Sequence, residues 1–252
     1  MRGRVALVTG ASSGIGEAIA LGLAAEGVRL AVAARRIERL ESVAKRAREL
    51  GAADARAFAL DIRDAASVRS MFDGVRAAFG DVEILIANGG GPKPGGYAEV
   101  TPADWDAAYR STLRGMLDLV DAVLPGMRAR KWGRIVALTS SSVKQPIPNI
   151  VLSNAFRTAL VAALKTLSNE VARDGITVNS IATGRVATDR LRELYSDEKE
   201  MREAAEREVP IGRVASPQEF APLAVFLCGE PASYVTGQTI AVDGGLIRGL
   251  YG

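Results

Sequence analysis

The fold of this chain is decided at residues 9–16, Thr9-Gly10-Ala11-Ser12-Ser13-Gly14-Ile15-Gly16. An apolar run, residues 5–8, precedes this stretch, and an apolar-rich run, residues 17–23, follows it. This pattern indicates a buried strand, a glycine turn and the beginning of a helix. Glycines permit the tight turn and let backbone N–H groups approach a pyrophosphate, which the helix N-terminus also attracts. We therefore expect dinucleotide binding here, rather than a turn that serves packing alone.

The composition narrows the class of protein. A chain of 252 residues with 48% hydrophobic residues can bury one large core, although length alone does not exclude two small domains. The net charge of +3 comes from interspersed acidic and basic residues, which argues against a nucleic-acid partner. Strand-like sequence begins within the first few residues, and no apolar run reaches membrane-spanning length. We expect a cytoplasmic protein with no membrane partner.

The rare residue types restrict the chemistry. The only cysteine is Cys228 and there is no histidine, so an intramolecular disulfide is excluded and we expect no metal site. Any proton transfer must therefore use Tyr, Lys, Ser, Asp, Glu or a chain of water molecules.

Strand and helix patterns alternate along the whole chain. After the first strand, strands are expected at residues 28–34, 55–60, 82–87, 133–139, 176–182 and 238–242. Helices are expected between them at residues 37–50, 65–79, 102–130, 152–173 and 217–227. This alternation predicts an α/β fold: a single-domain, Rossmann-like, doubly wound parallel seven-stranded sheet with helices on both faces, spanning residues 1–252. Ligands should bind beyond the carboxyl ends of its strands.

Three segments carry a resemblance to a known family. The chain resembles the short-chain dehydrogenase/reductase family, most closely its 3-oxoacyl-[acyl-carrier-protein] reductase-like members. The resemblance is carried by the spacing Thr-Gly-x-x-x-Gly-x-Gly at residues 9–16 and by the sequences of residues 169–179 and 234–245. The resemblance extends over essentially the whole chain. It implies a nicotinamide dinucleotide cofactor, a small carbonyl or alcohol substrate, assembly as a homotetramer or homodimer, and a substrate lid at about residues 186–212.

The residues after the second strand favour NADP(H) over NAD(H). In NAD-binding folds an acidic residue at this place holds the ribose 2′-hydroxyl, whereas an arginine accommodates a 2′-phosphate. This chain has Ala34 there, followed by Arg35 and Arg36. The alternative is that the two arginines are merely solvated at the start of a helix.

Other cofactor contacts follow from the resemblance. Asp61 resembles the family's acidic residue beside the adenine, with a helix cap as the alternative. Asn88 and Gly89 stand where the family has Asn-Asn-Ala-Gly, a run that suits close approach to a cofactor but could also be a flexible turn. Thr188 matches a threonine that bonds the cofactor. The expected cofactor-binding residues are Gly10, Ser12, Ser13, Gly14, Ile15, Gly16, Arg35, Arg36, Asp61, Ile62, Asn88, Gly89, Arg157, Gly184, Val186 and Thr188.

The catalytic positions depart from the family pattern. The family has a serine after the fifth strand, a tyrosine thirteen residues later, a lysine four residues after that, and an asparagine in the preceding long helix. With the register anchored at residues 169–179, these positions hold Ser140, Ser153, Arg157 and Thr112. The sequence thus predicts an atypical member in which the catalytic Tyr and Lys are replaced.

The replacements bear mainly on proton transfer. A phenol with a pKa near 10 can be tuned toward neutrality, whereas a serine hydroxyl such as that of Ser153 is far less acidic. Arg157 keeps the positive charge and can bond ribose hydroxyls, but it does not release a proton at ordinary pH. We expect cofactor binding to survive these changes better than proton transfer does.

Other groups are candidate proton donors. Lys144 follows Ser140 by four residues and could protonate an alkoxide if burial lowered its pKa; a solvated loop lysine is the alternative. Tyr97 is a weaker candidate. Tyr195 and Lys199 repeat the Tyr-x-x-x-Lys spacing, which we interpret as a coincidence on a lid helix. The expected catalytic residues are Ser140, Ser153, Arg157 and Lys144.

Two hypotheses of function follow. The first is an NADP(H)-dependent oxidoreductase that interconverts a carbonyl and a hydroxyl, in a 3-oxoacyl thioester or another small ketone. The second is a nucleotide-binding protein with little or no reductase activity, which acts as a sensor or assembly partner. Elimination or isomerisation with a structural NADP is a third option, for which the sequence offers no positive feature. Residues 92–96 and 141–150 and the lid should shape the substrate pocket.

Overall fold

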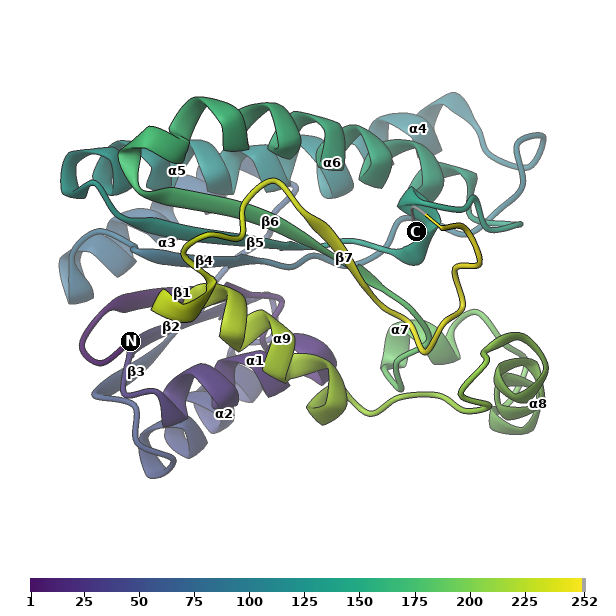
Figure 1. Cartoon of the computed structure of the whole chain (residues 1–252), viewed down its shortest axis with the longest axis horizontal. Coiled ribbons are helices and arrows are strands. Elements are labelled where there is room, and N and C mark those ends of the chain that lie inside the picture. The colour runs from purple at the N-terminus through teal and green to yellow at the C-terminus, as the bar shows by residue number, and fades with distance from the viewer. Residues whose placement is uncertain (251–252) are drawn as a thin grey trace.

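The computed structural model describes residues 1–250, which form an α/β domain around one parallel sheet (Figure 1). The strands are β1 (Val5–Thr9), β2 (Arg29–Ala34), β3 (Asp54–Ala59), β4 (Ile84–Ala87), β5 (Gly133–Leu138), β6 (Ile176–Thr183) and β7 (Thr239–Val242). Their order in the sheet is β3-β2-β1-β4-β5-β6-β7, and every neighbouring pair is parallel. The predicted doubly wound seven-stranded sheet is confirmed, with strand ends within two residues of those expected.

Helices cover both faces of this sheet. The main helices are α1 (Gly14–Ala25), α2 (Ile37–Glu49), α3 (Ala65–Phe79), α5 (Gly115–Arg130), α6 (Val151–Val171) and α9 (Pro217–Cys228). In Figure 1, α1, α2 and α9 lie on one face, and α3, α5 and α6 lie on the other. Each face has its own apolar core. In α3, for example, the stripe predicted from sequence is buried: Val68, Met71, Phe72, Val75 and Phe79.

The long helix expected at residues 102–130 is not one continuous α-helix. It divides into α4 (Pro102–Ala108), a π-helical segment η1 (Tyr109–Arg114) and α5. Where α5 begins, it passes so close to the loop after β3 that a Cβ on Gly115 would lie 2.2 Å from the carbonyl oxygen of Ile62. A π-helical turn contains an extra residue and changes which side chains face inward, and such turns are frequent at functional sites. The apolar periodicity continues through the segment, so the sequence pattern did not reveal this interruption.

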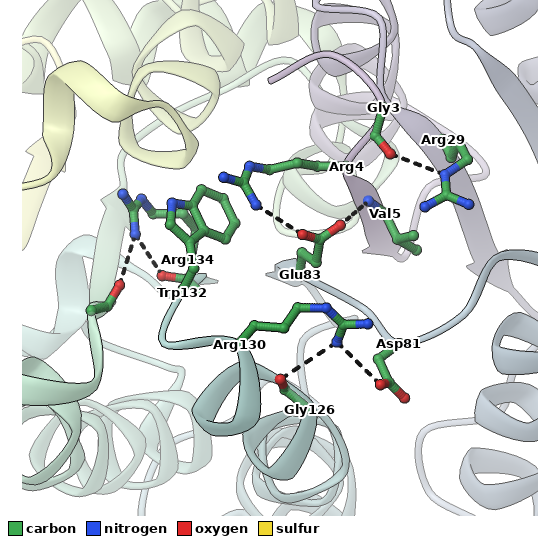
Figure 2. A network of polar contacts seen from close by, with 12 residues as sticks. Gly3, Arg4, Val5, Arg29, Asp81, Glu83, Gly126, Arg130, Trp132 and Arg134 are labelled. Carbon is green, nitrogen blue, oxygen red and sulfur yellow. Dashed lines mark hydrogen bonds and ion pairs between the residues drawn. The ribbon is translucent and has the colours of Figure 1, made fainter.

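Cationic and aromatic side chains join the amino ends of the central strands (Figure 2). Arg4 forms an ion pair with Glu83 at 2.8 Å, and Glu83 also accepts a hydrogen bond from the backbone N–H of Val5. The guanidinium groups of Arg4 and Arg134 both lie over the ring of Trp132, at 3.5 and 4.3 Å from its centroid. These contacts join β1, β4 and β5 at their amino ends, on the side of the sheet away from the cleft described below. Their position indicates a structural role.

The segment of residues 186–212 lies beyond the carboxyl ends of the strands. It contains the short helices α7 (Asp189–Arg192) and α8 (Glu198–Glu208), which project past the carboxyl ends of the strands in Figure 1. Within residues 1–250, none of the helices combines the length and apolar character needed to cross a bilayer.

Candidate active site

A cleft of about 600 Å³ runs along the carboxyl ends of β1 to β6. Its wall contains residues that follow each of these strands by no more than two positions. In strand order these are Gly10, Arg35, Asp61, Asn88, Ser140 and Gly184. The strand order reverses between β1 and β4, and ligands of open parallel sheets bind at such a reversal. We call the part next to Arg35 and Arg36 the nucleotide end of the cleft, and the part next to Ser140 the reaction end.

The glycine turn at the nucleotide end admits no side chains. Gly10 has a φ of +61°, and a Cβ there would lie 2.6 Å from Nδ2 of Asn88. A Cβ on Gly16 would lie 2.3 Å from the carbonyl oxygen of Gly10. Asn88 also donates a hydrogen bond to that oxygen at 3.3 Å, and the hydroxyl of Thr9 donates to the carbonyl oxygen of Asn88 at 2.7 Å. Asn88 therefore joins the end of β4 to the glycine turn.

The N-terminus of α1 has unpaired donors beside a cationic cluster. Ser13 occupies the N-cap position but makes no side-chain cap bond. Its Oγ instead accepts from Nη2 of Arg36 at 2.8 Å, and Oγ of Ser12 accepts from the same atom at 3.0 Å. Within residues 1–250, neither Arg35 nor Arg36 forms a salt bridge. The N-terminal N–H groups of α1 fit the pyrophosphate of a dinucleotide, and the guanidiniums of Arg35 and Arg36, which form no salt bridge within residues 1–250, fit an additional phosphate.

The structure brings every expected cofactor-binding residue to this cleft. Asp61 bonds Arg63 at 2.6 Å, and this hydrogen bond lowers the pKa of the Asp61 carboxyl to about 2. The cap of α3 is Asp64, which accepts from the N–H of Ala66 at 2.8 Å, so the alternative reading of Asp61 as that cap is wrong. Thr188 caps α7, and its methyl group would lie 3.0 Å from a Cβ on Gly14. The start of the 186–212 segment thus contacts the glycine turn.

Three of the four expected catalytic residues meet at the reaction end: Ser140, Ser153 and Arg157. Oγ of Ser140 accepts a hydrogen bond from the N–H of Ser142 at 3.1 Å, which leaves its own proton available for donation. Ser153 is buried in the first turn of α6. Arg157 donates from Nη1 to the carbonyl oxygen of Leu138 at 3.0 Å. Burial, together with the nearby Arg190, lowers the pKa of Arg157 to about 10, so its guanidinium stays charged at neutral pH.

The structure does not bring the other candidates to the cleft. Lys144 is half-buried after a 3₁₀ turn and does not line the cleft. Tyr97 is 80% exposed and lies outside it. Tyr195 lies in a bend before α8, the helix that contains Lys199, so the expected lid helix with both residues is wrong. Thr112 is buried in η1, and its neighbour Ser111 lines the cleft instead.

Several cleft residues were missed by sequence reasoning. Lys93 and Asp104 form an ion pair at 2.9 Å on the wall of the reaction end, and Arg190 reaches the same wall from α7. Arg190 directly follows Thr188 and Asp189, so its place next to an expected cofactor residue was an available signal. No spacing rule joins Lys93 to Asp104, because the contact depends on how the loop after β4 folds. Within residues 1–250, no group of three or more His, Cys, Asp or Glu side chains could hold a metal ion.

The parallel sheet, the strand reversal and the glycine turn define a Rossmann-like domain. A family model described as enoyl-(acyl carrier protein) reductase matches residues 10–247. The chain is 36% identical over 246 residues to 3-oxoacyl-[acyl-carrier-protein] reductase FabG of Salmonella typhimurium, covering 97% of each chain. It belongs to the short-chain dehydrogenase/reductase family, whose members are oxidoreductases.

Two solved structures extend this relationship. YwfH, an NADPH-dependent reductase involved in bacilysin biosynthesis, superimposes with a TM-score of 0.93 at 31% identity, over 98% of this chain and 100% of its own. L-sorbose reductase from Gluconobacter frateurii, complexed with NADPH and L-sorbose, gives a TM-score of 0.92 at 34% identity, over 99% and 98% of the two chains. Both similarities extend through the cleft and the 186–212 segment, since nearly the whole chain is covered.

Proposed function

We propose that this protein is an NADP(H)-dependent oxidoreductase that interconverts a carbonyl and a hydroxyl by hydride transfer, with a 3-oxoacyl thioester or another small ketone as substrate. One observation carries the proposal: a single cleft joins the glycine turn, Arg35 and Arg36 at one end to Ser140 at the other. The NADPH bound in L-sorbose reductase and the NADPH dependence of YwfH support the choice of cofactor.

The nucleotide end would hold the phosphates. The N–H groups at the start of α1 suit the pyrophosphate, and Arg36 with the hydroxyls of Ser12 and Ser13 suits a 2′-phosphate. Asn88 keeps the glycine turn in its shape. Arg157 has donors beyond the one used on Leu138, and these suit ribose hydroxyls.

The reaction end would orient and polarise the carbonyl. NADPH, when bound, supplies the hydride. The hydroxyl of Ser140 donates a hydrogen bond to the carbonyl oxygen, where negative charge develops during the reaction. The proton that completes the alcohol would come from the hydroxyl of Ser153, which a chain of water molecules reprotonates from the solvent as it is donated. Lys144 is the alternative proton source, and it requires a movement of its loop toward the cleft.

Substitution of Ser140 by Ala tests this assignment. Loss of one donor to a developing oxyanion lowers turnover by about 100- to 1,000-fold, so we expect a fall of this order for Ser140→Ala in NADPH oxidation assays with small ketones. Under the water-relay route, Lys144→Ala lowers turnover by less than about threefold, whereas a loss as large as that of Ser140→Ala assigns the proton to Lys144. Unchanged turnover in both variants contradicts the proposed mechanism.

A second candidate function is nucleotide binding with little or no reductase activity, as a sensor or assembly partner. The observation that favours it is the pair Ser153 and Arg157, neither of which readily supplies a proton. The double variant Ser153→Tyr with Arg157→Lys separates the two. A large gain in ketone reduction favours an enzyme that has lost its reductase activity. No gain, or a loss, favours a chemistry that already uses Ser153 and Arg157.

Assembly as a homotetramer or homodimer and a cytoplasmic location complete the proposal. The exposed aromatic side chains of Phe226 and Tyr234, near the C-terminal strand, are compatible with a subunit interface. Sedimentation equilibrium of the purified protein checks the assembly state, and a monomer at micromolar concentration contradicts it.

A further inference from the structure

Arg190 connects the 186–212 segment to the opposite wall of the reaction end. It lies in the single turn of α7, and its Nη2 donates to the carbonyl oxygen of Pro92, 98 residues away in sequence, at 2.7 Å. Its Nη1 bonds Glu193 at 3.1 Å. A Cβ on Gly91 would lie 2.5 Å from its Nε, so the guanidinium lies directly against the backbone of that loop. The side chain lines the cleft and is only 34% exposed.

The reaction end carries positive charge that is not fully compensated. Lys93 is paired with Asp104 at 2.9 Å, and Asp189 is paired with Arg192 at 3.1 Å. Arg157, by contrast, forms no salt bridge within residues 1–250. Its guanidinium donates a hydrogen bond to the backbone carbonyl oxygen of Leu138. Arg190 is close enough to disfavour the charged form of Arg157. Arg190 has Glu193 as its carboxylate partner at 3.1 Å, so the charge that lacks a carboxylate partner is that of Arg157. An anion bound between the two guanidiniums would relieve their repulsion.

In the proposed placement, the phosphates of the cofactor lie at the nucleotide end, against the glycine turn and Arg36. The nicotinamide ring carries no negative charge. An anion that pairs with Arg190 at the reaction end would then come from the substrate. A guanidinium held by two fixed partners, Pro92 and Glu193, has an orientation suited to a planar carboxylate.

We propose that Arg190 binds a carboxylate of the substrate, so that the substrates are oxo acids and their hydroxy-acid counterparts. This inference rests on the proposed function and narrows its substrates to small ketones that carry a free carboxylate, which excludes a simple 3-oxoacyl thioester. The carboxylate remains unchanged in the reaction: the ketone carbon gains a hydride, its oxygen gains a proton, and the hydroxy acid leaves. Arg190 determines specificity by anchoring the acid group, while Ser140 acts on the carbonyl.

Kinetics with matched acids and esters test the anchor. The substrates are a 2-oxo, a 3-oxo and a 4-oxo acid, each compared with its methyl ester, under saturating NADPH. A charge-assisted hydrogen bond changes affinity by about 10- to 100-fold, so the wild-type protein should prefer the best acid over its ester by at least about tenfold in kcat/KM. Arg190→Gln should raise KM for that acid by a similar factor with a smaller change in kcat, and should leave the ester unaffected. Arg190→Lys should be intermediate.

Arg202→Gln is the matched control. Arg202 is exposed on α8 in the same 186–212 segment, bonds the carbonyl oxygen of Glu198 and does not line the cleft, so the kinetics of Arg202→Gln should equal those of the wild type. If the wild-type protein reduces acids and esters at equal rates, or if Arg190→Gln loses activity equally on both, Arg190 does not bind the substrate carboxylate. Ketone reduction in the same assays would still support the proposed function.

A binding measurement separates the two claims if no ketone is reduced. Calorimetric titration of the NADP⁺-loaded protein with 3-hydroxybutyrate and with 3-hydroxybutanamide should show binding of the acid alone, lost in Arg190→Gln. That result supports the anchor even where the oxidoreductase proposal fails. Absence of binding to the wild-type protein, or equal binding to Arg190→Gln, overturns the anchor.

Discussion

The two ends of the cleft differ in what they demand of the sequence. The nucleotide end consists of backbone geometry and charge: a glycine turn, a helix N-terminus without a side-chain cap, and two arginines that form no salt bridge within residues 1–250. The reaction end needs a proton donor of suitable pKa, and there the sequence register predicts that Ser153 and Arg157 occupy the positions of a tyrosine and a lysine in the family. Binding tolerates many side chains that supply the same charge, whereas proton transfer depends on particular acidities. The difference indicates that cofactor recognition and the reductase chemistry can be altered separately.

The largest effect is expected from a side chain in the glycine turn. Gly16→Val places a Cβ against the carbonyl oxygen of Gly10, where the available distance is 2.3 Å, and it should weaken NADPH binding by at least about 100-fold. Ser140→Ala, at the reaction end, should change NADPH binding by less than about threefold. Fluorescence titration of both variants measures this contrast, with circular dichroism as the check on folding. If the two variants lose binding equally, the division of the cleft into two ends is wrong.

A smaller and cofactor-specific effect is expected at Arg36. Arg36→Gln removes the guanidinium bonded to Ser12 and Ser13, and loss of charge-assisted bonds to a 2′-phosphate should weaken NADPH binding by about 10- to 100-fold. NADH binding should hardly change, because NADH lacks that phosphate. Arg39→Gln is the control, since Arg39 is exposed on α2 and does not line the cleft. Equal losses for both cofactors would show that Arg36 has only a structural role.

A moderate effect on stability is expected at Asn88. Asn88→Ala removes the bond to Gly10 that joins β4 to the turn, and one such hydrogen bond contributes about 1 kcal/mol to the free energy of unfolding. For a protein of this size the midpoint of thermal unfolding should fall by about 2–4 °C. Calorimetry measures the shift. A normal midpoint with weakened NADPH binding would instead indicate that Asn88 contacts the cofactor directly.

The smallest effect concerns acid stability at Asp61. Its folded pKa of about 2 lies below the ordinary 3.8 because of Arg63, so the ionised carboxylate stabilises the folded state. This contribution is present above about pH 4 and is lost as the pH falls toward 2. Since the ion pair is partly exposed, we expect less than about 1 kcal/mol. Urea unfolding should show Asp61→Asn slightly less stable than wild type at pH 7, with a difference that shrinks as the pH falls from 4 toward 2. A difference that stays constant over this range contradicts this account.

Much of the fold was predictable because it depends on local, repeated patterns. Apolar strands without alternation, amphipathic helices and the glycine turn fixed the order of the elements and the side of the sheet where the cleft lies. The π-helical segment at Tyr109–Arg114 was not predictable, since no local sequence signal distinguished it from the α-helices on either side.

The site was predictable where residues follow strand ends and unpredictable where loops cross. Arg36 and Ser140 reach the cleft simply because they follow β2 and β5. Arg190 reaches Pro92 only because two segments far apart in sequence converge, which no spacing reveals. Lys144 was misjudged for the same reason: its distance from Ser140 in sequence does not determine where its loop lies.

Titration of the purified protein with NADPH and with NADH, followed by fluorescence, tests the central claim most directly. The account predicts tight NADPH binding and NADH binding weaker by at least about tenfold, because the charge at Arg35 and Arg36 recognises the extra phosphate. Absence of binding to either cofactor would contradict the oxidoreductase proposal, and it would mean that this family fold serves another purpose in this protein.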